Sequence, residues 1–254
     1  ARTQRALVAY WISGTSETTP PSNAYYTAAP VAEIQAHHRA AIEQLWKGAG
    51  CEANLPVGSP AATGFIGSRL IPFDDDVRTL AAHLGSRIST PAKLTDWPAV
   101  CEFHNRFTAW VVEFLYFATA HRPVEDPFDD HASISLKLRS LLIGDKIFGQ
   151  SEERRLVPLC DSACRQLELY LAHLEGLYAL IPARFEQLRS EIQSQLANRR
   201  ARILPLFFLL DPEGNWYSVS PTTHIQHFPE QWNLPDNFHR HLLACWFYRK
   251  GISE

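Results

Sequence analysis

The sequence predicts a mainly α-helical protein with a small antiparallel β-sheet. In several separate segments, apolar residues recur at the three- and four-residue spacing of amphipathic helices. One stretch near the middle instead combines Ile, Leu and Ser in partial alternation before a polar turn, which is typical of short antiparallel strands. Hydrophobic residues make up 46% of the 254 residues, which suffices for one large domain or two small ones.

The first part of the chain, residues 1–95, is predicted to be a helical region of its own. Residues 1–30 are rich in Thr, Ser, Pro and Ala, and we expect a poorly packed arm there. Residues 31–48 carry apolar side chains at helical spacing and end in a glycine, which predicts a helix. Gly and Pro recur at short intervals in residues 49–74, which indicates a loop. A short helix should follow near residues 75–85, ending at its terminal glycine.

A second region, residues 96–254, begins with a long predicted helix that reaches to about residue 120. Asp96 is a suitable N-cap, and Pro98 falls in the first turn, where its missing N–H costs nothing. The helix is strongly apolar, yet it leads directly into Arg122 and a proline.

Strands are predicted after this helix, in residues 132–146 and in the segment Glu153–Cys160, with a polar turn between them. Further helices are predicted from an Asp161 cap, over residues 183–202, and from an Asp236 cap to Gly251. Residues 203–220 are expected to form a hairpin around the turn Asp-Pro-Glu-Gly.

The bulk composition excludes several classes of protein. Charged residues are 20% and the net charge is −3, so the chain is neither disordered nor globally basic. The five scattered cysteines lack the paired spacing of a zinc site and fit a reducing cytoplasm; no cofactor or metal is predicted. No apolar run approaches the ~20 residues of a membrane span. The chain contains no methionine, and we expect it to be a fragment that is incomplete at its C-terminus.

Basic residues gather at the ends of predicted elements. They are Arg122, Lys146 with Arg154 and Arg155, the run Arg199, Arg200 and Arg202, and His239-Arg240-His241 with Arg249-Lys250. Two arginines and a lysine of this kind could converge on one phosphate, whose oxygens match the planar guanidinium group. The alternative is structural, since an arginine is favoured at a helix C-terminus and Glu125 could pair locally with Arg122.

The order of these segments resembles the catalytic domain of the tyrosine recombinases, the phage-type integrases, over residues 97–254. Their T-G-x-R-x-x-E motif is matched by Thr119-Ala120-His121-Arg122-Pro123-Val124-Glu125. Their hairpin lysine and R-x-V-P-L strand are matched by Lys146 and Arg155-Leu156-Val157-Pro158-Leu159. Their H-x-x-R-H motif is matched by Asn237-Phe238-His239-Arg240-His241. Residues 178–234 look like an insertion relative to this pattern.

The resemblance implies a mainly helical recombinase-like fold and the cleavage and rejoining of double-stranded DNA through a phosphotyrosine, for site-specific recombination or integration of a mobile element. Arg122 and Arg240 would bind the scissile phosphate and stabilise its developing charge. Lys146 would protonate the leaving oxygen, and Glu125 would orient Arg122. Further candidates for contacts with DNA are Arg155, His239, Arg199, Arg200 and Arg202, although the last three could simply end their helix.

Two departures from the family pattern bear on activity. Asn237 replaces the first histidine, and an amide cannot act as a base near neutral pH, so His241 or, as a second choice, His239 is expected to compensate. The family's attacking tyrosine lies beyond the end of this chain, and Tyr248 is expected to be a core residue. The chain alone is therefore expected to be inactive.

The resemblance also implies partners and a role for the first region. Residues 1–95 would belong to a domain that binds the core DNA site, and the enzyme would work as a homo-oligomer assembled on DNA. A rival hypothesis is a catalytically inactive DNA-binding or scaffold protein with the same fold, which Asn237 favours. An unrelated helical protein with chance motifs is the third possibility.

Overall fold

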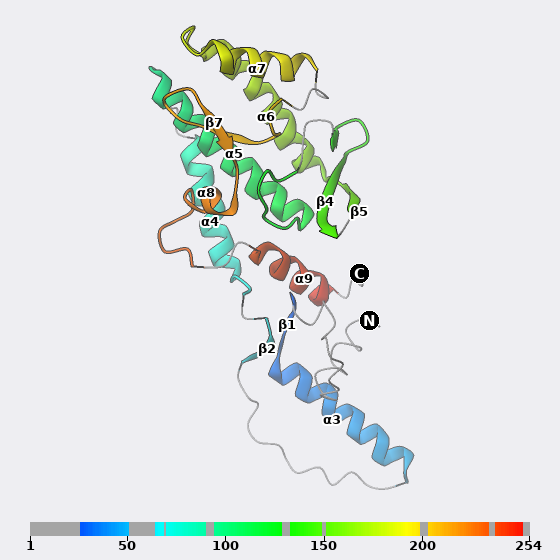
Figure 1. Ribbon diagram of the computed structural model, residues 1–254. Helices are drawn as coiled ribbons and strands as arrows, with labels where there is room; N and C mark the ends of the chain where they lie inside the picture. The colour runs from blue at the N-terminus through cyan, green and yellow to red at the C-terminus, as the bar shows by residue number, and fades with distance from the viewer. Residues whose placement is uncertain are drawn as a thin grey trace. The chain divides into compact units, whose positions relative to one another are not determined.

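The structure is a computed structural model in which residues 26–50, 64–68, 70–89, 94–128, 133–148, 151–198, 203–233 and 237–250 are described (Figure 1). For residues 145–148 and 151–153 the description covers the backbone. The chain divides into two compact units. Unit 1 comprises the described residues of Ala1–Pro72 and Phe238–Glu254, and unit 2 those of Phe73–Asn237. The predicted domain boundary, at residues 95 and 96, thus lies inside unit 2.

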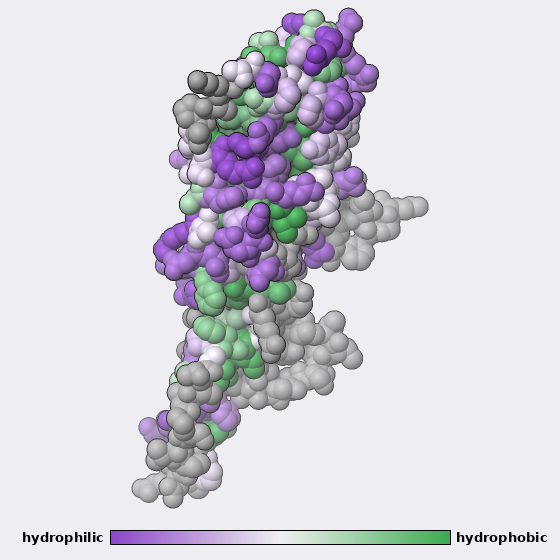
Figure 2. All heavy atoms as spheres, turned by 90° about the vertical axis from the view of Figure 1, so that its left-hand side faces the viewer, coloured by the Kyte–Doolittle hydropathy of each residue, from purple (hydrophilic) through white to green (hydrophobic). Residues whose placement is uncertain are grey.

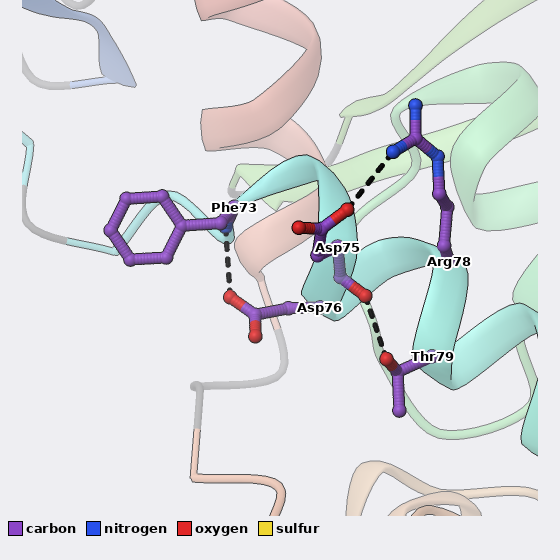
Figure 3. Close-up of polar contacts among 5 residues, drawn as sticks. All are labelled: Phe73, Asp75, Asp76, Arg78 and Thr79. Carbon is purple, nitrogen blue, oxygen red and sulfur yellow. Dashed lines mark hydrogen bonds and ion pairs between the residues drawn. The ribbon is translucent and has the colours of Figure 1, made fainter.

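Unit 2 begins with helix α4, Asp74–Ser89, whose first turn is stabilised by its own side chains (Figure 3). The carboxylate of Asp76 accepts a hydrogen bond from the backbone N–H of Phe73 at 2.9 Å. Three aspartates in the first turn stabilise the helix, because their negative charges lie near the positive end of the helix dipole. The helix does not end at Gly85 as predicted. A Cβ there would lie 3.5 Å from the ring of Trp110, so this glycine lies within α4, facing Trp110, and does not end the helix.

Helix α5, Trp97–Thr119, is the central element of unit 2 and matches its predicted bounds closely. Asp96 caps it as expected, because its side chain accepts a hydrogen bond from Ala99 N at 2.9 Å. Twelve of its residues are buried, which explains its strong hydrophobicity. It packs against helix α6, Asp161–Leu180, and Trp110 Nε1 donates to Gln166 Oε1 across this contact at 3.0 Å.

An antiparallel sheet of three strands follows α5, as the sequence predicts. Its strands, in spatial order, are β3 (Ile134–Ser135), β4 (Ser140–Phe148) and β5 (Ser151–Pro158). Strands β4 and β5 form a long hairpin with an irregularity between Gly144 and Lys146. The expected polar turn is shorter than predicted, because both strands extend into it.

The rest of unit 2 covers α5 and α6. Its elements are α7 (Glu186–Ala197), β6 (Phe208–Leu210), β7 (Trp216–Ser218) and the short helix α8 (Pro221–Ile225). The predicted hairpin is confirmed, with β6 antiparallel to β7. Asp161 is not the N-cap of α6 as predicted; Cys160 takes that position and Asp161 pairs with Arg139. The segment 178–234 contributes much of the core, including all of β6.

The described residues of unit 1 include a two-stranded sheet and two long helices. They are β1 (Ala28–Pro30), β2 (Phe65–Gly67), α3 (Val31–Gly48) and α9 (Phe238–Lys250). Helix α3 has the predicted bounds, but the two strands lie in segments predicted to be an arm and a loop. Their pairing requires Gly67, because a Cβ there would lie 2.2 Å from the carbonyl oxygen of Thr27. Tyr248 is buried, as expected, and its hydroxyl donates to Glu33 at 3.2 Å.

The surface of unit 2 is mainly hydrophilic on the face that Figure 2 turns to the viewer, with smaller hydrophobic areas between the polar side chains. Among the described helices, none is both long and apolar enough to span a membrane.

Candidate functional site

The C-terminal end of α5 places Arg122, the first candidate phosphate ligand. The helix stops because Ala120 adopts a left-handed backbone conformation with φ of 53° and ψ of 27°. Its N–H still bonds to the carbonyl oxygen of Tyr116 at 2.9 Å, which satisfies part of the last turn. The position therefore demands the conformation that glycine adopts most easily, and alanine occupies it at some cost.

The segment that follows, residues 120–128, contains most of the backbone strain found in the described part of the chain. Four described residues other than glycine have positive φ, and three of them are Ala120, Asp126 and Phe128. Such conformations cost free energy and persist only where the surroundings enforce them, and they cluster at functional sites. Arg122 lies within this enforced segment.

Buried contacts on both sides of Arg122 enforce the conformation. The ring of His121 is buried with its centroid 5.1 Å from that of Phe128, and Phe128 itself is inserted in the core. Further along, the N–H of Asp126 donates to the carbonyl oxygen of Val219 at 2.9 Å. Burial also raises the pKa of the Asp126 carboxyl above its ordinary value. The segment is thus fixed at both ends.

A buried hydrogen bond between a histidine and a glutamate supports the second of these anchors. His224 Nε2 donates to Glu113 Oε2 at 2.9 Å, and both side chains are almost fully buried. Glu113 belongs to α5, while His224 belongs to α8, which starts two residues after Val219. Ser220 caps α8 through a reciprocal hydrogen-bond pair with Thr223. The pair therefore ties the Val219 anchor to the central helix.

The β4–β5 hairpin brings a second basic side chain to the same end of α5. Arg155 Nη2 donates to the carbonyl oxygen of Thr119 at 3.4 Å, so its guanidinium lies where the helix dipole is negative. Arg122 is half-buried and Glu125 is exposed. Arg122 and Arg155 are thus both placed by the last turn of α5. The orientation of Arg122 by Glu125 stays a prediction.

Lys146 lies on β4, where its backbone is paired with Glu153 just after the irregularity at Gly144. It stands two residues before the end of the strand, close to the hairpin turn, as the sequence predicts. Its side chain lies outside the described part of the structure, as do all atoms of Arg199, Arg200 and Arg202. Their predicted roles stay predictions.

The remaining candidates lie at the start of α9: His239, Arg240 and His241 belong to unit 1, whereas Asn237, directly before the helix, is the last residue of unit 2. Arg240 is half-buried, and its Cζ lies 5.0 Å from the centroid of the Tyr26 ring. His241 is fully buried, and Ser68 Oγ lies 2.7 Å from its Nδ1. His239 is also buried, with its ring 3.9 Å from that of Phe238. Asn237 precedes the helix and is half-buried.

The environment of His241 keeps the ring neutral. Burial first, and then the charge of Arg240, lower the pKa of His241 to about 4. Ser68 Oγ already accepts a hydrogen bond from Leu70 N at 3.1 Å, so its own hydroxyl proton can be donated to Nδ1. A neutral, buried imidazole of this kind is suited to a hydrogen bond, not to carrying charge.

Two sets of candidates therefore emerge. Arg122, Arg155, the Lys146 strand and Asn237 belong to unit 2, while His239, Arg240 and His241 belong to unit 1. Their convergence on one phosphate stays a prediction. Among the residues that the structure describes, no group of three His, Cys, Asp or Glu side chains is placed to hold a metal ion.

Several supporting residues escaped the sequence analysis, namely Tyr26, Ser68, Glu113, Val219 and His224. Each meets its partner across more than 90 residues of chain, so no local motif announces it. One signal was present for Glu113, because a lone acidic residue in an apolar helical run usually has a buried partner.

Comparison of the sequence with models of known protein families gives no match, and comparison with curated protein sequences gives none either.

Proposed function

We propose that this chain belongs to a site-specific DNA recombinase of the tyrosine type, which cleaves and rejoins double-stranded DNA. The motif match over residues 97–254 is the basis of this proposal. In it, Arg122 and Arg240 bind the non-bridging oxygens of the scissile phosphate. Homo-oligomers assembled on DNA would carry out the exchange of strands, as in the family that the motifs resemble.

The observation that carries the proposal is the conformation of Ala120. The family's motif has a glycine directly before the residue that precedes its arginine, and residue 120 has the left-handed backbone that calls for one. The arginine two residues later is anchored through Phe128 and Val219. A salt-bridging surface arginine needs no such support, whereas a phosphate ligand that must be preorganised does.

The chemistry assigned to the site is a phosphoryl transfer that needs no metal. A tyrosine hydroxyl loses its proton to solvent as its oxygen attacks the phosphorus, a 3′-phosphotyrosine bond forms, and the bond to the 5′-oxygen breaks. The leaving oxygen takes a proton from Lys146, and the two guanidinium groups stabilise the charge on the equatorial oxygens. No residue of this chain that matches a family motif is that tyrosine.

A second candidate function is an inactive DNA-binding or scaffold protein with the recombinase fold. Asn237 favours it, because an amide is not a base. The burial of His241 against Ser68 and Tyr26 favours it too, since this histidine was expected to compensate. Both functions share the phosphate contacts and differ in the covalent step.

The covalent step is the decisive test. Duplexes that the full-length protein binds would be selected from a random library and rebuilt with a nick that lets the cleaved end diffuse away. A covalent protein–DNA adduct is expected on denaturing gels, and Arg122→Ala and Arg240→Ala should abolish it. Arg165→Ala, which removes an exposed arginine on α6 paired with Glu168, is the matched control. Binding without any adduct would favour the scaffold protein.

A further inference from the structure

We propose that Tyr26 is a positioning residue that holds the guanidinium of Arg240 in place for a DNA phosphate. The inference rests on the proposed function and adds a residue from the opposite end of the chain to it. Tyr26 precedes β1, whereas Arg240 belongs to the first turns of α9. Both lie in unit 1.

The contact between the two side chains is a cation–π interaction. Arg240 Cζ lies 5.0 Å from the centroid of the Tyr26 ring, within the range in which the face of an aromatic ring attracts a cation. A guanidinium that stacks on a ring keeps its N–H groups at its edge, so they stay available for phosphate oxygens. Stacking thus restricts the arginine without using its donors.

Tyr26 is itself positioned by His241, the residue next to Arg240. The two rings lie 4.9 Å apart at an angle of 58°. His241 is fixed by Ser68, which in turn accepts a hydrogen bond from Leu70 N. The fully buried imidazole therefore supports the ring on one side.

The β1–β2 pair fixes the backbone on both sides of this arrangement. Ala28 N lies 3.1 Å from Cys245 Sγ, one turn of α9 beyond His241. Ser68 N donates to the carbonyl oxygen of Thr27 at 2.8 Å. The residues that neighbour Tyr26 and Ser68 are thus bonded to each other and to α9. These bonds fix the backbone from which the Tyr26 ring extends, which is the property expected of a preorganised site.

A role in positioning predicts different effects for different substitutions. Tyr26→Phe keeps the ring and should leave DNA binding unchanged. Tyr26→Leu keeps a large apolar side chain but removes the π face, so Arg240 loses its restraint. We expect Tyr26→Leu to weaken binding of a random-sequence duplex by about fivefold and to lower the salt slope of log K by about one.

The closing experiment is a double-mutant cycle on the full chain. Binding of a fluorescein-labelled random-sequence duplex would be measured by anisotropy at several salt concentrations for wild type, Tyr26→Leu, Arg240→Ala and the double variant. Circular dichroism would confirm that each variant is folded. We expect Tyr26→Leu to have no further effect once Arg240 is absent, because its effect passes through the guanidinium.

The outcomes separate the inference from the function on which it rests. If Arg240→Ala weakens binding but Tyr26→Leu does not, the positioning role is overturned and the proposed function stands. Equal effects of Tyr26→Leu with and without Arg240 would also overturn it, because the tyrosine would then act on its own. If Arg240→Ala leaves affinity and salt slope unchanged, Arg240 binds no phosphate and both proposals fall.

Discussion

The imidazole of His224 donates a hydrogen bond of 2.9 Å to the carboxylate of Glu113, and both side chains are buried. This pair joins α8 to α5 beneath the segment that carries Arg122. Removing one partner leaves the other buried without its counterpart, which is far costlier than replacing both. The pair therefore fixes the Val219 anchor. Loss of the pair should lower the free energy of unfolding and also disturb the segment that carries Arg122.

Glu113→Ala should destabilise unit 2 by about 3 kcal/mol, since it leaves the His224 ring buried opposite a cavity. Glu113→Gln keeps an acceptor for His224 Nε2 and should cost much less, about 1 kcal/mol. Urea unfolding followed by circular dichroism measures both. Equal costs for the two variants would show that neither the hydrogen bond nor the side-chain volume contributes, and that only the carboxylate charge matters.

The conformation of Ala120 makes a prediction of opposite sign. Ala120→Gly should stabilise the protein by about 0.5–1 kcal/mol, because it removes the left-handed penalty of the Cβ and retains the hydrogen bond to Tyr116. The matched control is Ala82→Gly, at an exposed position inside α4, which should cost about 1 kcal/mol. Thermal unfolding of the two variants checks the pair. Destabilisation by Ala120→Gly would mean that residue 120 is not left-handed.

The long helices were predictable because their signals are local. Asp96 and Pro98 define the start of α5, and apolar periodicity defines α3, so both helices have nearly the predicted bounds. Strands β1 and β2 were missed because each has three residues and they pair across an intervening segment that contains α3. Gly85 and Asp161 were misassigned because tertiary contacts, with Trp110 and Arg139, override the usual preferences of glycine and aspartate.

The candidate site was predictable only in its motif residues. Arg122 could be placed at a helix end because the apolar run and Pro123 are adjacent to it in sequence. The residues that fix it, such as Val219 and His224, lie about 100 residues away and have no motif of their own. The same holds for Tyr26 against Arg240. Sequence motifs thus show which groups bind, whereas long-range packing decides how rigidly they are held.

Two neighbouring histidines of unit 2, the buried His104 and the half-buried His173, make stability depend on pH. His104 Nε2 lies 3.0 Å from the carbonyl oxygen of Phe208 and therefore carries a proton, so its Nδ1 accepts from His173 Nε2 at 3.0 Å. Burial first, and then His173, lower the pKa of His104 well below its ordinary value. Burial lowers the pKa of His173 to about 4.

The sign follows from comparison with the unfolded chain, whose histidines titrate near 6.5. Above that pH these histidines are neutral in the folded and in the unfolded chain, so their protonation does not lower the free energy of unfolding. As pH falls from about 6.5 to about 4 the unfolded chain takes up protons that the folded core refuses, so each such histidine lowers stability by about 1.4 kcal/mol per pH unit.

His173→Gln should reduce this pH slope by about one proton, because glutamine can still donate to His104 but does not titrate. Urea unfolding at several pH values between 7 and 4.5 measures the slope. His37→Gln, which makes the same substitution at an exposed histidine of α3, is the matched control. An unchanged slope in His173→Gln would contradict the lowered pKa of His173 in the folded chain.

Arg155 allows a structural role to be separated from a role in binding DNA. Its guanidinium donates to the carbonyl oxygen of Thr119 at the end of α5. Arg155→Gln retains a donor for that oxygen and removes the charge. If Arg155 also contacts a DNA phosphate, the variant should keep its free energy of unfolding within about 0.5 kcal/mol, while the salt slope of duplex binding falls by about one.

Arg165→Gln, which removes an exposed charge on α6, should leave the slope unchanged. A slope that is the same in Arg155→Gln and wild type would restrict Arg155 to stabilising the helix end, and would leave Arg122 as the phosphate ligand at that end of α5.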